Sequence, residues 1–224
     1  IMNLPTKITF SRIIAIIVMM VSLFVCYLIN KFNHSFITDN WSFGIENGWN
    51  GINLIYFILF IFFLIASYTD HLDGKLARKN NQVTTLGKFL DPVADKLLIN
   101  SMVIFLVIPW AFSPDQMQFS VWCAILLVAR DIVVDALRFI AAEKGETIAA
   151  NIFGKIKTVL EMVAISFVLL NDFPFALIYG DKVPAGLRVT DFLVYAATIM
   201  SLISGVIYVV KGIDVFEQKP NKEN

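Results

Sequence analysis

The sequence predicts an all-α integral membrane protein with six transmembrane helices, an N-terminal interfacial segment and both termini in the cytoplasm. Composition, long runs without charge and an uneven distribution of Lys and Arg predict this class. Of the 224 residues, 58% are hydrophobic and only 16% are charged, and the mean hydropathy is +0.73, whereas soluble domains are nearer half apolar and a quarter charged. The 18 basic residues balance 18 acidic ones. The chain therefore lacks the basic surplus of a nucleic-acid-binding protein.

The predicted spans come from apolar runs long enough to cross about 30 Å of hydrocarbon as a helix. Four runs contain no charge: Ile13–Ile29, Gly51–Thr69, Leu97–Pro114 and Phe192–Val210. Two further apolar segments carry internal charges, namely Gln116–Ala129 with its continuation to Arg138, and Ile156–Leu170. Counting both as spans gives six helices in a single membrane domain, residues 1–215, followed by a polar cytoplasmic tail, residues 216–224.

The orientation follows from Lys and Arg, which favour cytoplasmic loops. With the N-terminus inside, most basic residues outside the spans gather on one face, and only Lys31, Lys182 and Arg188 fall on the other. Both termini are therefore expected in the cytoplasm of a multi-pass cell-membrane protein. The segment from Asn3 to Arg12 predicts a short interfacial helix. The long first apolar run, without a small-residue cleavage site, predicts a retained span rather than a signal peptide.

Acidic residues near the second and third predicted spans are the first candidate functional residues. Asp70 and Asp73 are three apart, and Asp91 and Asp95 are four apart, so each pair shares one face of a helix. Two adjacent antiparallel helices could aim all four carboxylates at one point, where they repel unless a cation lies between them. Oxygen ligands without Cys or paired His suit Mg²⁺ or Mn²⁺. The pattern therefore predicts a site for one or two metal ions.

Small and basic residues accompany these acids. Gly74, Ala77 and Gly87 leave room for a flat ligand to approach the backbone. Arg78 could bind a phosphate through two parallel hydrogen bonds. A solvated cytoplasmic loop would explain the nearby lysines, but it explains poorly four Asp at helical spacing beside two apolar spans.

Together these positions form the run Asp70-x2-Asp73-Gly74-x2-Ala77-Arg78-x8-Gly87-x3-Asp91-x3-Asp95. The run resembles the complete signature of the CDP-alcohol phosphatidyltransferase family. The resemblance implies six transmembrane helices, usually in a homodimer, with two divalent metal ions near the cytoplasmic interface. It implies that Asp70, Asp73 and Asp91 are metal ligands and that Asp95 is both a metal neighbour and the general base. It also implies that the CDP-linked lipid is bound by Asp70, Asp73, Gly74, Ala77, Arg78 and Gly87.

The signature leaves the acceptor alcohol open among glycerol phosphate, inositol phosphate, serine, choline and another phospholipid. A phosphorylated acceptor needs fixed cations, and the candidates are Arg130, Arg138, Lys155 and Lys157. For Arg130, ion pairs along its own helix with Asp131 or Asp135 are an equally good interpretation. That alternative is weaker for Lys155 and Lys157, which have fewer acidic partners close in sequence.

Three further segments resemble the bacterial phosphatidylglycerophosphate synthases of the same family. They are Asn3-Leu4-Pro5 with Thr9 and Arg12, Ala141–Gly145, and Gly154–Thr158. The resemblance implies transfer of the phosphatidyl group from CDP-diacylglycerol to sn-glycerol 3-phosphate, giving phosphatidylglycerophosphate and CMP at the cytoplasmic side. Lys155 and Lys157, with Arg138 and Arg130, would bind the acceptor phosphate. Arg12 could also reach the headgroup, although its charge has a sufficient explanation in orienting the first span.

Two alternatives differ from this interpretation. A sister transferase would use inositol phosphate as acceptor, or phosphatidylglycerol as in cardiolipin synthesis, and composition does not exclude it. A small ion-coupled transporter belongs to another class of protein. Such proteins have carboxylates near the bilayer midplane, broken helices and often paired repeats. The acids of this chain cluster at the cytoplasmic ends of two spans, and no internal repeat is visible.

Overall fold

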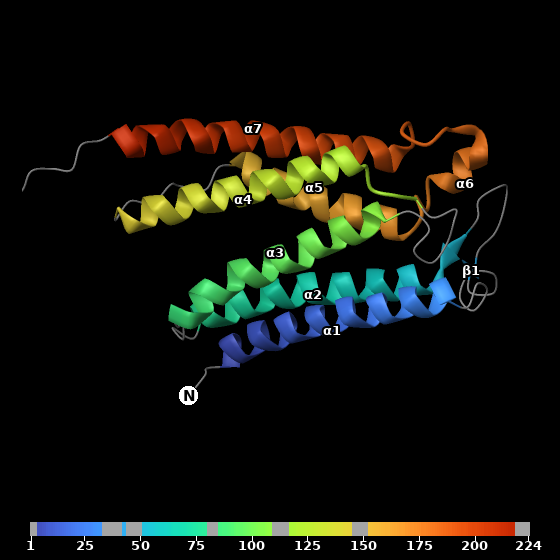
Figure 1. Ribbon diagram of the computed structural model, residues 1–224, viewed down its shortest axis with the longest axis horizontal. Helices are drawn as coiled ribbons and strands as arrows, with labels where there is room; N and C mark the ends of the chain where they lie inside the picture. Colours follow the sequence, from blue (N-terminus) through green and yellow to red (C-terminus); the bar gives the residue numbers. More distant parts are fainter. Residues whose placement is uncertain are drawn as a thin grey trace, which may run out of the picture. The chain divides into compact units, whose positions relative to one another are not determined.

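A computed structural model describes residues 4–32, 42–43, 51–79, 85–108, 117–144 and 152–217. Six long helices dominate these residues (Figure 1): α1 Leu4–Phe32, α2 Leu54–Lys79, α3 Thr85–Val107, α4 Val121–Glu143, α5 Ile152–Leu169 and α7 Val189–Glu217. Each of them overlaps one of the six predicted spans, although α3 begins at Thr85 and ends at Val107 whereas the third span was predicted at Leu97–Pro114. The shorter elements are the antiparallel strands β1 Ser42–Phe43 and β2 Ile52–Asn53, the helix α6 Ala176–Tyr179 and the 3-10 turn η1 Gly180–Lys182.

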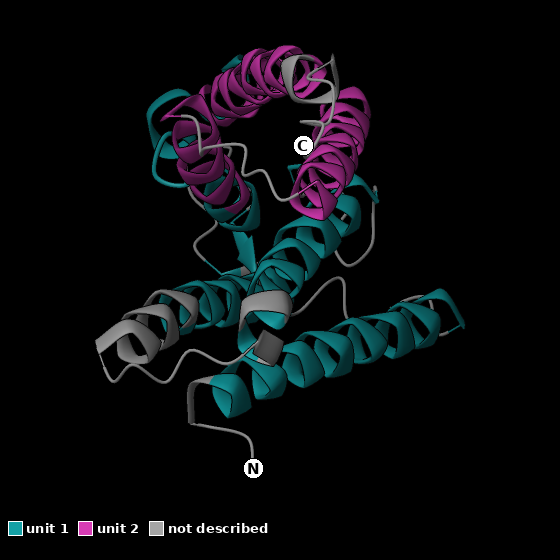
Figure 2. Cartoon of the chain, turned by 90° about the vertical axis from the view of Figure 1, so that its left-hand side faces the viewer, with its two compact units in different colours: residues 1–118, 166–183 teal, residues 119–165, 184–224 magenta. Residues whose placement is uncertain are grey.

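The chain divides into two compact units, coloured teal and magenta in Figure 2. Unit 1 comprises residues 1–118 and 166–183, and unit 2 comprises residues 119–165 and 184–224. Helices α1, α2 and α3 pack against one another in unit 1, and α4 packs against α7 in unit 2. The predicted acidic site therefore belongs to unit 1, whereas four of the five predicted acceptor-binding cations belong to unit 2.

Two helices are long and apolar enough to cross a membrane, judged by length and composition of the described residues. They are Thr6–Phe32 within α1 and Val189–Ile213 within α7. Both carry large apolar side chains on their outer faces: Phe24 of α1 is 60% exposed and Val206 of α7 is 63% exposed. Apolar faces of this extent are unfavourable in water and favourable in lipid. The helical fold is thus consistent with an integral membrane protein, and the six-span topology stays a prediction.

Helix α1 departs from the expected division into an interfacial segment and a span. It begins at Leu4 and continues without interruption to Phe32. The segment expected to lie separately on the membrane surface is instead the first part of one helix. In a continuous helix the backbone N–H and C=O groups bond to one another. None of them is therefore left without a partner where a chain enters the hydrocarbon of a bilayer.

Local hydrogen bonds mark the ends of two helices in unit 2. At the start of α7, one carboxylate oxygen of Asp191 accepts the backbone N–H groups of Gly186 at 2.8 Å and Arg188 at 3.1 Å. A negative charge there also opposes the positive end of the helix dipole. At the end of α4, the N–H of Lys144 donates to the carbonyls of Ile140 and Ala141.

A buried asparagine joins three segments of unit 1. Asn171 follows α5 with a positive φ of 54°, a conformation that Asn adopts more readily than most residues. Its amide nitrogen donates to the carbonyl of Gly51 at 2.8 Å, and its amide oxygen accepts the N–H of Met117 at 2.9 Å. The side chain therefore satisfies two backbone groups from distant parts of the chain.

Replacing Asn171 by Gly should destabilise the protein by about 1–3 kcal/mol, because buried hydrogen-bonding groups of Gly51 and Met117 would lose their partner. Glycine tolerates the positive φ, so the change removes the two side-chain hydrogen bonds without straining the backbone. The expected result is a lower unfolding temperature of the purified protein in detergent. An unfolding temperature equal to that of the wild type would show that these bonds contribute nothing to stability.

Candidate functional site

Helices α2 and α3 carry the four predicted metal-binding acids. Asp70 and Asp73 lie in the last part of α2, and Asp91 and Asp95 lie in the first half of α3. The predicted helical spacing of both pairs is confirmed, and the two helices contact each other. For Asp70, Asp73, Gly74, Ala77 and Arg78 the structure describes the helical backbone alone. Convergence of four carboxylates on one point thus stays a prediction.

The α3 half of the site is described in more detail. Gly87, Asp91 and Asp95 follow one another at intervals of four residues, so they occupy one stripe of the helix. Gly87 is buried, and the two acids are partly buried. The hydroxyl of Thr9 on α1 donates a hydrogen bond to Oδ1 of Asp91 at 2.8 Å. A residue 82 positions away in sequence thereby touches a predicted metal ligand.

The first turns of α1 bury polar side chains. Thr6, Thr9 and Arg12 are 3%, 1% and 5% exposed, and they recur every three residues on one face. Ile16, fully buried, continues that face with an apolar residue. Buried polar residues are more informative than exposed apolar ones. In the sequence this face is recognisable as three polar residues at helical spacing that precede an apolar run. Thr9 is nevertheless not among the predicted site residues.

The donor set fits a divalent metal ion, because Asp91 and Asp95 offer oxygen ligands one helical turn apart. Within the part of the chain that is described, no group of three or more His, Cys, Asp or Glu side chains could hold an ion. The side chains of two predicted ligands, Asp70 and Asp73 on α2, are not among those described. Their contribution to a ligand set stays a prediction.

Unit 2 contains a buried network of charges. The ammonium group of Lys157 on α5 contacts Asp131 on α4, at 3.0 Å to Oδ1 and 2.9 Å to Oδ2. It also lies 2.6 Å from Oε2 of Glu161. Arg130 pairs with Oδ1 of Asp131 at 2.9 Å. Lys157 is 4% exposed and Glu161 is fully buried. Two cations and two carboxylates thus sit together, and their formal charges cancel.

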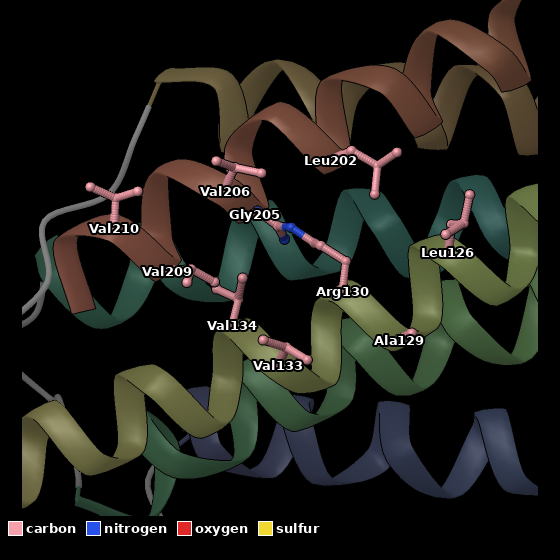
Figure 3. Close-up of a pocket in the computed structure, with 10 residues that line it drawn as sticks. All are labelled: Leu126, Ala129, Arg130, Val133, Val134, Leu202, Gly205, Val206, Val209 and Val210. Carbon is pink, nitrogen blue, oxygen red and sulfur yellow. The ribbon is translucent and has the colours of Figure 1, made fainter. Parts of the chain in front are cut away.

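Small residues on α7 accommodate the Arg130 side chain. Its Nη2 donates to the hydroxyl of Ser204 at 2.7 Å, and its Nε donates to the carbonyl of Ser201 at 3.2 Å. Figure 3 shows Arg130 reaching from α4 toward Gly205. A Cβ atom added at Gly205 would lie 3.0 Å from Cγ of Arg130. A larger residue at position 205 would therefore require the Arg130 side chain to shift, and small residues commonly occupy such close approaches between membrane helices.

Beside this contact lies a cavity of about 340 Å³ between α4 and α7 (Figure 3). Apolar side chains such as Leu126, Val134, Leu202 and Val206 line it together with Arg130. The guanidinium group is engaged by Asp131 and Ser204. The cavity thus offers an apolar wall rather than a polar binding site.

The predicted acceptor-binding cations differ in accessibility. Lys155 and Arg138 are exposed, whereas Lys157 and Arg12 are buried and Arg130 is partly buried. Arg138 stacks on Tyr208, with its guanidinium carbon 4.9 Å from the ring centroid, and donates to the phenolic oxygen at 2.6 Å. The ion-pair interpretation of Arg130 is confirmed by its contact with Asp131. Sequence reasoning missed Asp131 and Glu161 as partners of Lys157.

Comparison with known proteins adds a family assignment to this geometry. The model of one family, described as CDP-alcohol phosphatidyltransferase, matches residues 2–209. A Bacillus subtilis (strain 168) protein is 35% identical over 212 residues, which cover 93% of this chain and 94% of that protein. A Mycoplasma pneumoniae protein is 38% identical over 68% of this chain and 65% of its own length. For a Haemophilus influenzae protein the identity is 41%, over 50% of this chain and 60% of its own. All three relatives are named CDP-diacylglycerol--glycerol-3-phosphate 3-phosphatidyltransferase.

Proposed function

The chain belongs to the CDP-alcohol phosphatidyltransferase family and is a transferase, and from this premise we propose that it transfers the phosphatidyl group of CDP-diacylglycerol to sn-glycerol 3-phosphate. The products are phosphatidylglycerophosphate and CMP, as in phospholipid biosynthesis. The similarity to the Bacillus subtilis relative, which covers 94% of that protein, is the observation that carries the proposal. The family match leaves the transporter alternative without support.

The donor would be bound at the acidic site of unit 1. We propose Asp70, Asp73, Asp91 and Asp95 as ligands of a divalent metal, Mg²⁺ or Mn²⁺, with two ions per site. Dependence on a divalent metal is general in the family. When bound, such an ion supplies positive charge beside the pyrophosphate of the donor. Gly74, Ala77, Arg78 and Gly87 would line the cytidine and phosphate end of the CDP-lipid.

Asp95 would act as the general base. The acceptor hydroxyl loses its proton to the Asp95 carboxylate as its oxygen forms a bond to the lipid-linked phosphorus. The bond from that phosphorus to CMP breaks, and CMP leaves with the electron pair. The position of Asp95 on the same face of α3 as Asp91 supports placing base and donor phosphate together.

The acceptor phosphate would be bound by basic residues, among which Lys155 and Arg138 are exposed and thus directly available. Arg130, Lys157 and Arg12 complete the proposed set. A phosphate entering the buried network of Arg130 and Lys157 would meet the carboxylates of Asp131 and Glu161. Lys155 and Arg138 should therefore make the main contacts to the acceptor phosphate.

Replacing Lys155 by Ala should raise the KM for glycerol 3-phosphate about tenfold, the loss expected for one charge-assisted contact. The KM for CDP-diacylglycerol should change much less, because that substrate binds through other residues. Steady-state CMP release at varied concentrations of each substrate measures both values. Lys182→Ala, at an exposed lysine expected on the opposite membrane face, is the matched control. Equal effects on both KM values would contradict the assignment.

The proposed setting is a homodimer in the cell membrane, with six spans and both termini and the active site on the cytoplasmic side. The two helices that pass as candidate spans, and the positions of the other four long helices, support the span count. The concentration of Lys and Arg in the loops predicted to be cytoplasmic supports the orientation.

The experiment that tests the reaction is CMP release by the purified protein with CDP-diacylglycerol and Mg²⁺. Parallel reactions would contain glycerol 3-phosphate, inositol phosphate, serine, phosphatidylglycerol or no acceptor. We expect release with glycerol 3-phosphate alone and none after exhaustive chelation with EDTA. CMP release only with another acceptor would contradict glycerol 3-phosphate as the substrate, and it would leave the transfer of the phosphatidyl group from CDP-diacylglycerol intact. Full activity after chelation would contradict the metal site.

A further inference from the structure

The contact between Thr9 and Asp91 links α1 to the acidic site. The Thr9 hydroxyl donates to Oδ1 of Asp91 at 2.8 Å, and Thr9 is only 1% exposed. Asp91 is partly buried on the facing helix. The hydrogen bond is therefore shielded from water on the Thr9 side, where a solvent molecule cannot readily replace the hydroxyl.

The direction of this hydrogen bond sets Thr9 apart from other hydroxyls of the same protein. A Ser or Thr in a helix commonly donates back to a carbonyl three or four residues earlier. Ser22, Thr158 and Thr198 do so, at 2.8, 3.1 and 2.8 Å. Thr9 donates across to α3. As a β-branched residue it has only two common χ1 rotamers in a helix, so few orientations of its hydroxyl compete with this one.

A hydroxyl in this position restricts the rotation of the Asp91 carboxylate. Carboxylates that bind metal ions are usually hydrogen-bonded by neighbouring groups, which orient them, and loss of such a group weakens metal affinity. Asp91 lies one helical turn before Asp95, so its orientation decides whether both carboxylates can face one ion. The hydrogen bond from Thr9, in the first turns of α1, is placed where it can fix that orientation.

We propose that Thr9 is a positioning residue of the metal site, acting through its hydrogen bond to Asp91. The inference rests on the proposed function, because it assumes that Asp91 binds the metal. It assigns to α1 a role in the site besides membrane anchoring. The alternative is that the bond only holds α1 against α3, in which case its loss would affect stability and leave metal affinity unchanged.

The test is Mn²⁺ binding by the purified full-length protein without lipid substrate, followed by the electron paramagnetic resonance signal of free Mn²⁺. Thr9→Val is nearly isosteric and removes the donor, whereas Thr9→Ser retains it. Thr198→Val is the matched control, because it removes a buried hydroxyl whose bond stays within α7. The unfolding temperature of each metal-free variant reports on the fold separately.

We expect Thr9→Val to bind Mn²⁺ about ten- to a hundredfold more weakly, with Thr9→Ser and Thr198→Val close to the wild type. Wild-type affinity in Thr9→Val would overturn the positioning role and leave the proposed function intact. An equal loss in Thr9→Val and Thr198→Val would also overturn it, because the effect would then belong to the fold. Absence of Mn²⁺ binding by the wild type would instead contradict the metal site, and the inference with it.

Discussion

The Asp95→Asn variant should lose turnover by about 10²- to 10⁴-fold, the contribution usual for a general base. An amide is close in size to a carboxylate but does not take up the proton of the acceptor hydroxyl. The donor-binding residues that we propose on α2 would be unchanged, so binding of CDP-diacylglycerol should be partly retained. Initial rates of CMP release and the affinity for CDP-diacylglycerol, measured on the same preparation, separate these two effects.

A second acid-to-amide change controls for the loss of one negative charge. Glu143 is exposed at the end of α4 in unit 2, and Glu143→Gln should keep the wild-type rate. Substantial turnover in Asp95→Asn would show that another group takes the proton. Loss of donor binding together with turnover would assign Asp95 to the binding of the donor rather than to proton transfer.

The Lys157→Met variant should be less stable by about 3–5 kcal/mol, the cost of removing one partner from a buried ion pair. Lys157 contacts Asp131 and Glu161, and methionine offers neither carboxylate a charge or a hydrogen bond. Glu161 is fully buried, so water does not compensate the loss. The expected measurement is a markedly lower unfolding temperature in detergent, with less folded protein recovered from membranes.

Lys155→Met provides the matched control, because Lys155 is exposed on the same helix two residues earlier. Exposed charges contribute little to stability, so this variant should unfold near the wild-type temperature. Adding Glu161→Gln to Lys157→Met should restore part of the loss by removing one unpaired charge. Equal unfolding temperatures for Lys157→Met and Lys155→Met would show that the buried network does not stabilise unit 2.

Most long helices could be predicted because their cause is local. Apolar runs and helical spacing are properties of neighbouring residues, and each of the six predicted apolar segments overlaps one of α1 to α5 and α7. The bounds differ most for α3, which begins at Thr85 although the span was predicted from Leu97. The helical placement of Asp91 and Asp95 followed from their spacing of four. The boundary of α1 was less predictable, since its first turns carry polar residues that resemble a surface segment.

Partners from distant parts of the chain were not predictable in the same way. The ion pair of Lys157 with Asp131 joins positions 26 apart, and the bond from Thr9 to Asp91 joins positions 82 apart. From the sequence, Lys157 is a candidate for phosphate binding because few acids lie near it along the chain. Packing of α4 and α5 within unit 2 brings it the carboxylate of Asp131, whereas Glu161 lies one helical turn further along α5.

Hydropathy and residue spacing predict the all-α class, the positions of the long helices and the acidic signature on α2 and α3, because both act over a few residues. Helix packing determines which charges are buried and which pair with a residue of another helix, as Lys157 does with Asp131. Arg130 and Lys157 became part of a neutral buried network, whereas Lys155 remained accessible. The physical reason is that the energy of a charge depends on its burial and its nearest partners, and both are set by helix packing rather than by position along the chain.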